Sequence, residues 1–311
     1  MADPRDAYMA LALQTRCYAI NKIADPAAAR QRMAATLDRL AEQIALSKRF
    51  IGPDVALVVL PEYFLTGYPM GDTVAGWIAK AALEPDGPEY QRLGAIARDN
   101  AIYLSGNAYE IDAHFPGLYF QTSFIIDPDG AVILRYRRLN SMFAPTPHDV
   151  WDRYLEIYGL EGVFPVADTP IGRLACIASE EILYPEIARC LALRGAELFC
   201  HHSSEVASAQ ATPKHIARRA RALENMAFVV SANSAGIEGA GFPAASTDGG
   251  SGIVSPKGDI LAECATGESM AGSAEIDLAA LRRARRRPGM MNLLARQRLD
   301  LFAQTYAQTT V

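Results

Sequence analysis

Ser179 lies between a predicted short buried strand and a predicted helix. The apolar run from Leu174 to Ile177 has the composition of that strand, and Ser179 follows where the chain must turn. Pro185 then begins a helix, because the N–H that proline lacks would be unpaired there in any case. A hydroxyl on a sharp strand-to-helix turn is the geometry of a nucleophile elbow. Any strand followed by a helix has the same spacing, so the pattern alone leaves Ser179 either a nucleophile or an ordinary turn residue.

A carboxylate follows a second strand. Residues 55–60 read VALVVL, a β-branched run that is typical of a strand covered on both faces. Pro61 and Glu62 come directly after it. Glu62 is therefore either a solvated cap on the strand or a catalytic acid or base.

Alternating helices and strands must position these groups. Helices are predicted from apolar positions three or four residues apart, as at Met33, Leu37, Leu40 and Ile44, and strands from short β-branched runs between turn residues. The predicted strands cover residues 9–20, 55–60, 102–110, 119–126, 132–138, 174–177, 197–200, 228–232, 251–255, 260–263 and 273–276. The predicted helices cover residues 26–48, 73–83, 90–100, 185–194, 213–226 and 289–311, with a partly helical loop over 143–162.

Composition limits the class of protein. Half of the 311 residues are hydrophobic and the formal net charge is −5, so we expect a globular enzyme that binds neither nucleic acid nor a membrane. The basic run 282–287 is then a solvated helix face or a subunit contact. The five widely spaced cysteines favour free thiols in a reducing compartment, and the polar N-terminus is unlike a signal peptide. We therefore predict a cytoplasmic protein.

Three segments together resemble the nitrilase superfamily of carbon–nitrogen hydrolases. VVLPEYFLTGYP is similar to the first family motif, a Pro-Glu after a buried strand, and GAVILRYRRLN is similar to the second, a hairpin strand that ends in Arg-Lys. IGRLACIASEEILYPEIAR is similar to the third, in which a cysteine stands six residues before a Pro-Glu. The resemblance implies an α/β fold, a four-layer αββα sandwich in which two mixed sheets pack face to face with helices outside. It places this domain at residues 1–281, with a helical tail at 282–311 that packs on the body or on a partner subunit.

Carried over residue by residue, the resemblance makes Glu62 the general base. Arg138 stands where the family has its catalytic lysine, and Ser179 stands where it has its cysteine. A serine hydroxyl is far less acidic than a thiol and needs more help to become a nucleophile. Arginine can stabilise an oxyanion but cannot give up a proton at neutral pH. None of the five lysines follows a strand as in the second motif, so the lysine of that motif is predicted to be absent.

Other polar residues are candidates for contacts with a substrate. From the resemblance we predict that Tyr68, Glu181 and His202 bind substrate. His201 either faces the site or is an ordinary surface histidine. Cys176 lies inside the strand, and its thiol would have to reach past the turn to act as the nucleophile. The family's additional glutamate has no clear counterpart, and Asp149 or His148 could take its place.

The predicted function is that of a carbon–nitrogen hydrolase relative with an atypical Glu-Arg-Ser site. It would act on a small amide, nitrile or carbamoyl compound, covalently through Ser179 or by direct action of Glu62 on bound substrate. The resemblance implies no metal, no organic cofactor, and a homodimer or higher homo-oligomer. The alternative is an inactive or non-hydrolytic relative that binds a small molecule or a protein partner in the same pocket.

Overall fold

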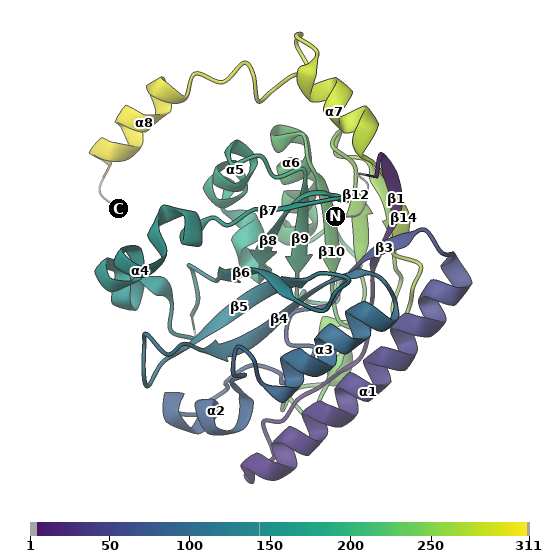
Figure 1. Ribbon diagram of the computed structural model, residues 1–311, viewed down its shortest axis with the longest axis vertical. Coiled ribbons are helices and arrows are strands. Elements are labelled where there is room, and N and C mark those ends of the chain that lie inside the picture. The colour runs from purple at the N-terminus through teal and green to yellow at the C-terminus, as the bar shows by residue number, and fades with distance from the viewer. Residues whose placement is uncertain (1–4, 143, 310–311) are drawn as a thin grey trace.

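Two six-stranded mixed sheets form the centre of the computed structural model, which describes residues 5–142 and 144–309 (Figure 1). The first sheet has the order β14 (Ser273–Asp277), β1 (Ala7–Ala12), β3 (Val55–Val59), β4 (Tyr103–Ile111), β5 (Tyr119–Ile126) and β6 (Val132–Arg137). The second has the order β13 (Ile260–Glu263), β12 (Gly252–Val254), β10 (Phe228–Ala232), β9 (Leu198–His202), β8 (Gly172–Ala178) and β7 (Ala167–Thr169). The neighbours β1–β3, β3–β4, β8–β9 and β9–β10 are parallel, and the other pairs are antiparallel.

Helices cover the outer faces of both sheets (Figure 1). The first sheet is covered by α1 (Pro26–Ile51) and α3 (Pro88–Asp99), with α2 (Val74–Ala81) beside them, and the second by α5 (Pro185–Leu193) and α6 (Pro213–Asn225). The remaining helices are α4 (Trp151–Val163), α7 (Leu278–Arg286) and α8 (Leu299–Gln308). This arrangement confirms the expected four-layer αββα sandwich.

Apolar side chains between the two sheets form one core, and those between the first sheet and its helices form another. The inter-sheet core includes Tyr136 from β6, Cys176 from β8 and Cys200 from β9, which are fully buried. Burial of this much apolar surface is the main favourable term in folding. It also holds the ends of β3, β6, β8 and β9 in fixed positions, and these are the ends that carry the polar groups singled out in the sequence.

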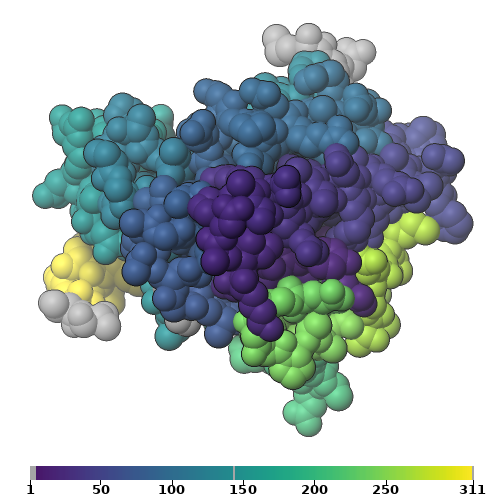
Figure 2. Space-filling view, turned by 90° about the horizontal axis from the view of Figure 1, so that it is seen from below, coloured from purple at the N-terminus to yellow at the C-terminus, as the bar shows by residue number. Residues whose placement is uncertain are grey.

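The N-terminal segment pairs with strands from the last third of the chain. β1 pairs with β14, and the short strand β2 (Cys17–Tyr18) pairs with β11 (Ile237–Glu238). Figure 2 shows the result, with the purple N-terminal segment against green residues of the C-terminal third. The single strand predicted for residues 9–20 is therefore wrong, because the chain leaves β1 after Ala12 and joins a different sheet at Cys17.

The C-terminal region differs from the expected continuous helical tail. α7 begins at Leu278 and is anchored to the body, since Leu278 and Leu281 are buried and Arg282 forms an ion pair with Glu197 at 2.8 Å. The predicted boundary between a domain at 1–281 and a tail at 282–311 cuts through α7. Among the described residues that follow α7, which end at 309, the helical ones are 299–308, and none of these is buried. The basic run thus contacts the body through some of its side chains.

Candidate active site

The side chains predicted to do chemistry emerge from neighbouring strand ends. Glu62 follows β3, Arg138 directly follows β6, and Ser179 directly follows β8. β3 and β4 are parallel, and β4, β5 and β6 are successively antiparallel, so β3 and β6 end at the same edge of the first sheet. The sheet architecture therefore explains how residues 76 positions apart, Glu62 and Arg138, come into contact.

Arg138 and Glu62 form a buried ion pair. Arg138 Nη1 donates to Glu62 Oε1 at 3.1 Å and to Gln121 Oε1 at 2.7 Å, and its Nε donates to the Asn140 carbonyl at 2.6 Å. The other terminal nitrogen, Nη2, is paired with Glu180. Burial disfavours the guanidinium charge, but the carboxylates around it, Glu62 first, outweigh that effect and raise the pKa of Arg138. Arg138 is thus largely engaged by protein groups.

One oxygen of Glu62 remains available for chemistry. Gln121 Nε2 donates to Oε1 at 2.7 Å, whereas Oε2 is buried and has no hydrogen bond of ordinary geometry within the described part of the chain. Burial, and after it the charge of Glu62, raises the pKa of the neighbouring Tyr63 well above its usual value. A fully buried carboxylate with one unpaired oxygen is suited to accepting a proton from a bound molecule.

Ser179 has a strained backbone. Its φ is 49°, in the left-handed region that side chains other than glycine rarely adopt, at a cost of roughly 1–2 kcal/mol. The ring of His201 holds this conformation, because its Nε2 donates to the Ser179 carbonyl at 2.8 Å while Nδ1 lies 2.8 Å from Ser231 Oγ. The turn between β8 and the helical segment that follows therefore has the sharp geometry expected of a nucleophile elbow.

A lysine that the sequence reasoning did not select lies against the serine. Lys214 Nζ donates to Ser179 Oγ at 3.2 Å and to the Ser204 carbonyl at 3.3 Å. Lys214 belongs to the first turn of α6, whose N-cap Thr212 accepts a hydrogen bond from the main-chain N–H of His215. The resemblance placed Arg138 at the lysine of the second motif, and no sequence pattern indicated that a helix start far along the chain would bring Lys214 to Ser179.

Glu181 is bound by protein donors on both oxygens. Its Oε2 accepts from the Tyr136 hydroxyl at 2.6 Å, and Oε1 accepts from the main-chain N–H groups of Leu139 and Asn140 at 2.8 and 2.9 Å. Burial raises its pKa to about 7, against the opposing effect of these hydrogen bonds. In this arrangement Glu181 fixes the chain next to Arg138, which is a different task from the predicted contact with substrate.

His202 and Cys176 lie in the inter-sheet core. His202 Nδ1 donates to the Leu60 carbonyl at 2.8 Å, its Nε2 lies 3.1 Å from Ser105 Oγ, and burial lowers its pKa to about 4. Ser105 Oγ is also 3.7 Å from Cys176 Sγ, whose pKa is raised well above its ordinary value by burial. Neutral His202 therefore links Glu62's strand to the second sheet, and Cys176 remains a protonated thiol below the serine.

The remaining candidates lie farther out. The half-buried Tyr68 has its ring 5.1 Å from that of Tyr63 and 6.0 Å from that of Phe242, and its pKa is raised by burial and by Glu62. Asp149 caps a short helical turn by accepting from the main-chain N–H of Thr146 at 2.7 Å. His148 packs against Trp151. Tyr68 is thus near Glu62, whereas Asp149 and His148 serve the local structure of their loop.

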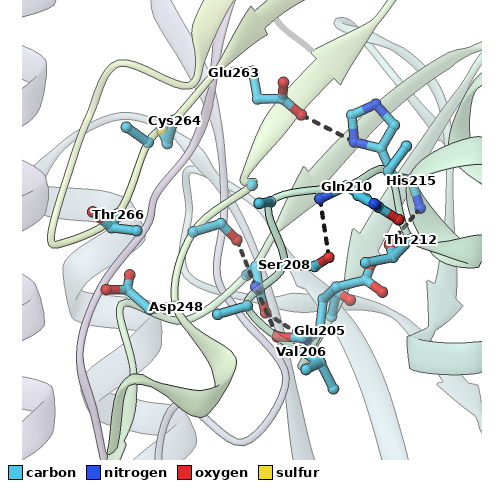
Figure 3. A pocket seen from close by; sticks show the side chains of 18 of the residues that line it. Glu205, Val206, Ser208, Gln210, Thr212, His215, Asp248, Glu263, Cys264 and Thr266 are labelled. Carbon is cyan, nitrogen blue, oxygen red and sulfur yellow. Dashed lines mark hydrogen bonds and ion pairs between the residues drawn. The ribbon is translucent and has the colours of Figure 1, made fainter.

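A cavity of about 660 Å³ is bordered by the loop between β9 and α6 (Figure 3), and Glu62, Arg138 and Ser179 are not among the residues that line it. Ser203 lines it, and the Ser203 carbonyl accepts a hydrogen bond from the Glu62 main-chain N–H at 3.2 Å. Its other polar lining residues carry both signs of charge; they include Glu205, His215, Arg218, Asp248 and Glu263. Figure 3 shows His215 directed at Glu263, to which its Nδ1 lies at 3.2 Å. The cavity is thus connected to Glu62 only through this main-chain hydrogen bond of Ser203, and the Glu62 carboxylate does not line it.

Comparisons with known proteins agree with this architecture. Residues 22–286 match the family model described as carbon-nitrogen hydrolase. An omega-amidase NIT2-A of Xenopus laevis is 28% identical over 241 residues, which cover 78% of this chain and 83% of the relative. A bifunctional nitrilase/nitrile hydratase NIT4B of Nicotiana tabacum is 28% identical over 302 residues, with coverage of 84% and 81%. The crystal structure of Saccharomyces cerevisiae Nit3, a member of the nitrilase superfamily, superimposes with a TM-score of 0.72 at 22% identity, covering 92% of this chain and 95% of Nit3.

The chain therefore belongs to the carbon–nitrogen hydrolase family, because the family model spans most of its length. The sequence resemblance to the nitrilase superfamily is confirmed at this level. No helix in residues 5–142 and 144–309 combines the length and apolar character needed to span a bilayer.

Proposed function

We propose that this protein hydrolyses the carbon–nitrogen bond of a small amide, with Ser179 as nucleophile and Glu62 as general base. The observation that carries the proposal is the Ser179 hydroxyl, held on a strained strand-to-helix turn with φ 49°. Strain of this kind persists only where the surrounding structure enforces it, and it is concentrated at functional sites. Ala101 and Met226 also have positive φ, so the strain supports the proposal through its position, directly after β8 and in contact with His201.

The unpaired oxygen of Glu62 supports its role as base. Ionised Glu62 would take the serine proton on Oε2 while Oε1 stays bound to Gln121 and Arg138. Arg138 would then keep Glu62 in position, and its remaining capacity to donate would serve a substrate oxygen. Tyr68, Glu181 and His202 would define the surroundings of the bound substrate, Glu181 and His202 through the main chain that they hold.

An amide is favoured as substrate class because several relatives bear the name omega-amidase, while a nitrile is the second class to test because another is named nitrilase/nitrile hydratase. We further propose that the reaction takes place in the cytoplasm, since all five cysteines are free. A homodimer is proposed from exposed apolar side chains on and beside α5 and α6, namely Tyr184, Leu193, Ile216 and Leu223. Light scattering on the purified protein tests the dimer.

The function is tested by ammonia release from a panel of small amides, nitriles and carbamoyl compounds. Ser179→Ala and Glu62→Gln should each reduce the rate at least about a thousandfold. Glu156→Gln, on an exposed helix face, is the matched control and should retain the native rate. Loss in Glu62→Gln alone would favour direct action of Glu62 on bound substrate. If the folded native protein binds these compounds but releases no ammonia, the inactive binding relative is the correct alternative.

A further inference from the structure

The Ser179 hydroxyl has a cationic partner that comes from another part of the fold. Lys214 Nζ lies 3.2 Å from Ser179 Oγ, and a second hydrogen bond to the Ser204 carbonyl at 3.3 Å fixes the ammonium group between them. The side chain is half-buried, so water screens it less than a surface lysine. Within the described residues, Lys214 is the side chain that donates a hydrogen bond to this hydroxyl.

Two other basic side chains near the turn, Arg138 and His201, are already engaged. Arg138 is bound by Glu62 and by Glu180, and His201 donates to the main-chain oxygen of Ser179 rather than to its hydroxyl. Burial lowers the pKa of His201 well below its usual value, so its ring is neutral at pH 7. Neither residue places a positive charge on Ser179 Oγ. Lys214 does.

We infer that Lys214 is a catalytic residue of this site, a cation that stabilises the Ser179 oxygen as negative charge develops on it. This inference rests on the proposed function of Ser179 as nucleophile. A serine in place of the family's cysteine makes the nucleophile much less acidic, so negative charge is harder to form on its oxygen. An ammonium group within hydrogen-bond distance stabilises that charge. The chain would thus have exchanged both the position of its lysine and the identity of its nucleophile.

The reaction steps balance with Lys214 keeping its protons throughout. Ser179 Oγ forms a bond to the amide carbon as its proton passes to Glu62 Oε2 and the carbonyl π electrons move to oxygen. The carbonyl re-forms, the C–N bond breaks, and Glu62 returns the proton to the departing nitrogen, which leaves as ammonia. Water then attacks the ester, its proton passes through Glu62 to Ser179 Oγ, and the carboxylic acid is released. Lys214 stabilises the serine oxygen whenever it attacks or leaves.

The decisive experiment measures the pKa of a thiol placed at position 179, which needs no substrate. Ser179→Cys and the double variant Ser179→Cys with Lys214→Met are titrated by the ultraviolet absorbance of the thiolate. The native protein, with its own five cysteines, is subtracted as the blank. Lys214 should hold the thiol pKa below the free value of about 8.5, and its removal should raise it by at least about one unit. Lys214→Arg should largely preserve the low value.

Other charged groups around position 179 must stay unchanged in this comparison. They are Glu180 and Glu181 beside it, His201 on β9, Arg138 and Glu62 at the facing sheet, and Arg218 on α6. All are retained in each variant, so a difference between variants reports Lys214. Lys257→Met, on an exposed hairpin turn, controls for the loss of one positive charge and should leave the thiol pKa unaltered. If Lys214→Met fails to fold, Lys214→Gln replaces it.

Activity gives the second readout. In the native background Lys214→Met should lower kcat/KM by a hundredfold or more for the best amide, as for loss of one oxyanion donor. In the Ser179→Ala background it should have no further effect, because the two residues act together. An unchanged thiol pKa would overturn the inference even in an active enzyme. A raised thiol pKa in a protein that hydrolyses nothing would uphold the Lys214 contact while refuting the proposed function.

Discussion

Replacing Glu181 by glutamine should make the protein's stability less dependent on pH. Glu181 is 0% exposed, and burial raises its pKa from the ordinary 4.5 to about 7. The folded state therefore binds the Glu181 proton more tightly than the unfolded state does. Between pH 4.5 and 7 the unfolded chain ionises first, so the free energy of unfolding falls as pH rises, and it levels off above pH 7.

The size of the effect follows from the two pKa values. A difference of about 2.5 units corresponds to roughly 3 kcal/mol at 1.36 kcal/mol per unit. Glu181→Gln keeps an oxygen for the N–H groups of Leu139 and Asn140, and its amide can donate to the Tyr136 oxygen in place of the present bond. It does not titrate. The native-minus-variant difference in unfolding free energy should therefore decrease by about 3 kcal/mol from pH 4.5 to 7.

Urea unfolding of both proteins at half-unit pH steps measures this difference. Glu156→Gln, whose carboxylate is exposed, is the control and should give a curve parallel to that of the native protein. Parallel curves for Glu181→Gln as well would refute the reasoning, since they would mean that the three donors hold the pKa of Glu181 near its ordinary value. A difference that grows with pH would have the wrong sign and would refute it more strongly.

Three further predictions concern stability. Arg138→Met leaves Glu62 as a buried charge without its cationic partner and should lower the free energy of unfolding by about 3–5 kcal/mol. Arg138→Lys keeps a cation and should lower it by less. Urea unfolding measures both variants. Ser179→Gly should be about 1 kcal/mol more stable than Ser179→Ala, because glycine adopts a φ of 49° without strain, although both lose the hydroxyl; equal stabilities would show that the turn is unstrained. Removal of residues 298–311 should change the unfolding free energy by less than about 0.5 kcal/mol, because α8 buries nothing; a larger thermal shift would contradict this.

Most individual strands and helices could be predicted because they follow regular patterns, whereas the four-layer sandwich was implied by the resemblance to the nitrilase superfamily. The buried run 55–60 and the helix after Pro26 correspond to β3 and α1, and Asp25 caps α1 with hydrogen bonds to Ala27 and Ala28. The strand predicted over 197–200 extends to His202, because the two histidines satisfy their ring nitrogens inside the sheet. The polar side chains of His201 and His202 suggested that the strand ends at Cys200. Their hydrogen bonds to other parts of the fold instead allow the strand to continue through both residues.

The polar site was predictable only in part. Motif order identified Glu62, Arg138 and Ser179, and the structure brings the first two into direct contact. Motif order could not reveal that Arg138 also binds Glu180 or that Lys214 contacts Ser179. These contacts depend on how the start of α6 and the loops around it pack against the two sheets. For the same reason Glu181 and His202, predicted to meet substrate, prove to have their polar atoms bound by protein groups.

The central claim, that Ser179 forms a covalent intermediate, is tested most directly by mass spectrometry of protein quenched during turnover of the best amide. The proposed mechanism predicts an added acyl group on the peptide that contains Ser179, absent from Ser179→Ala and formed far more slowly in Glu62→Gln, which lacks the base for acylation. Because Cys176 lies only three residues away, fragmentation must separate the two positions. An acyl group on Cys176, or full ammonia release by Ser179→Ala, would contradict the mechanism.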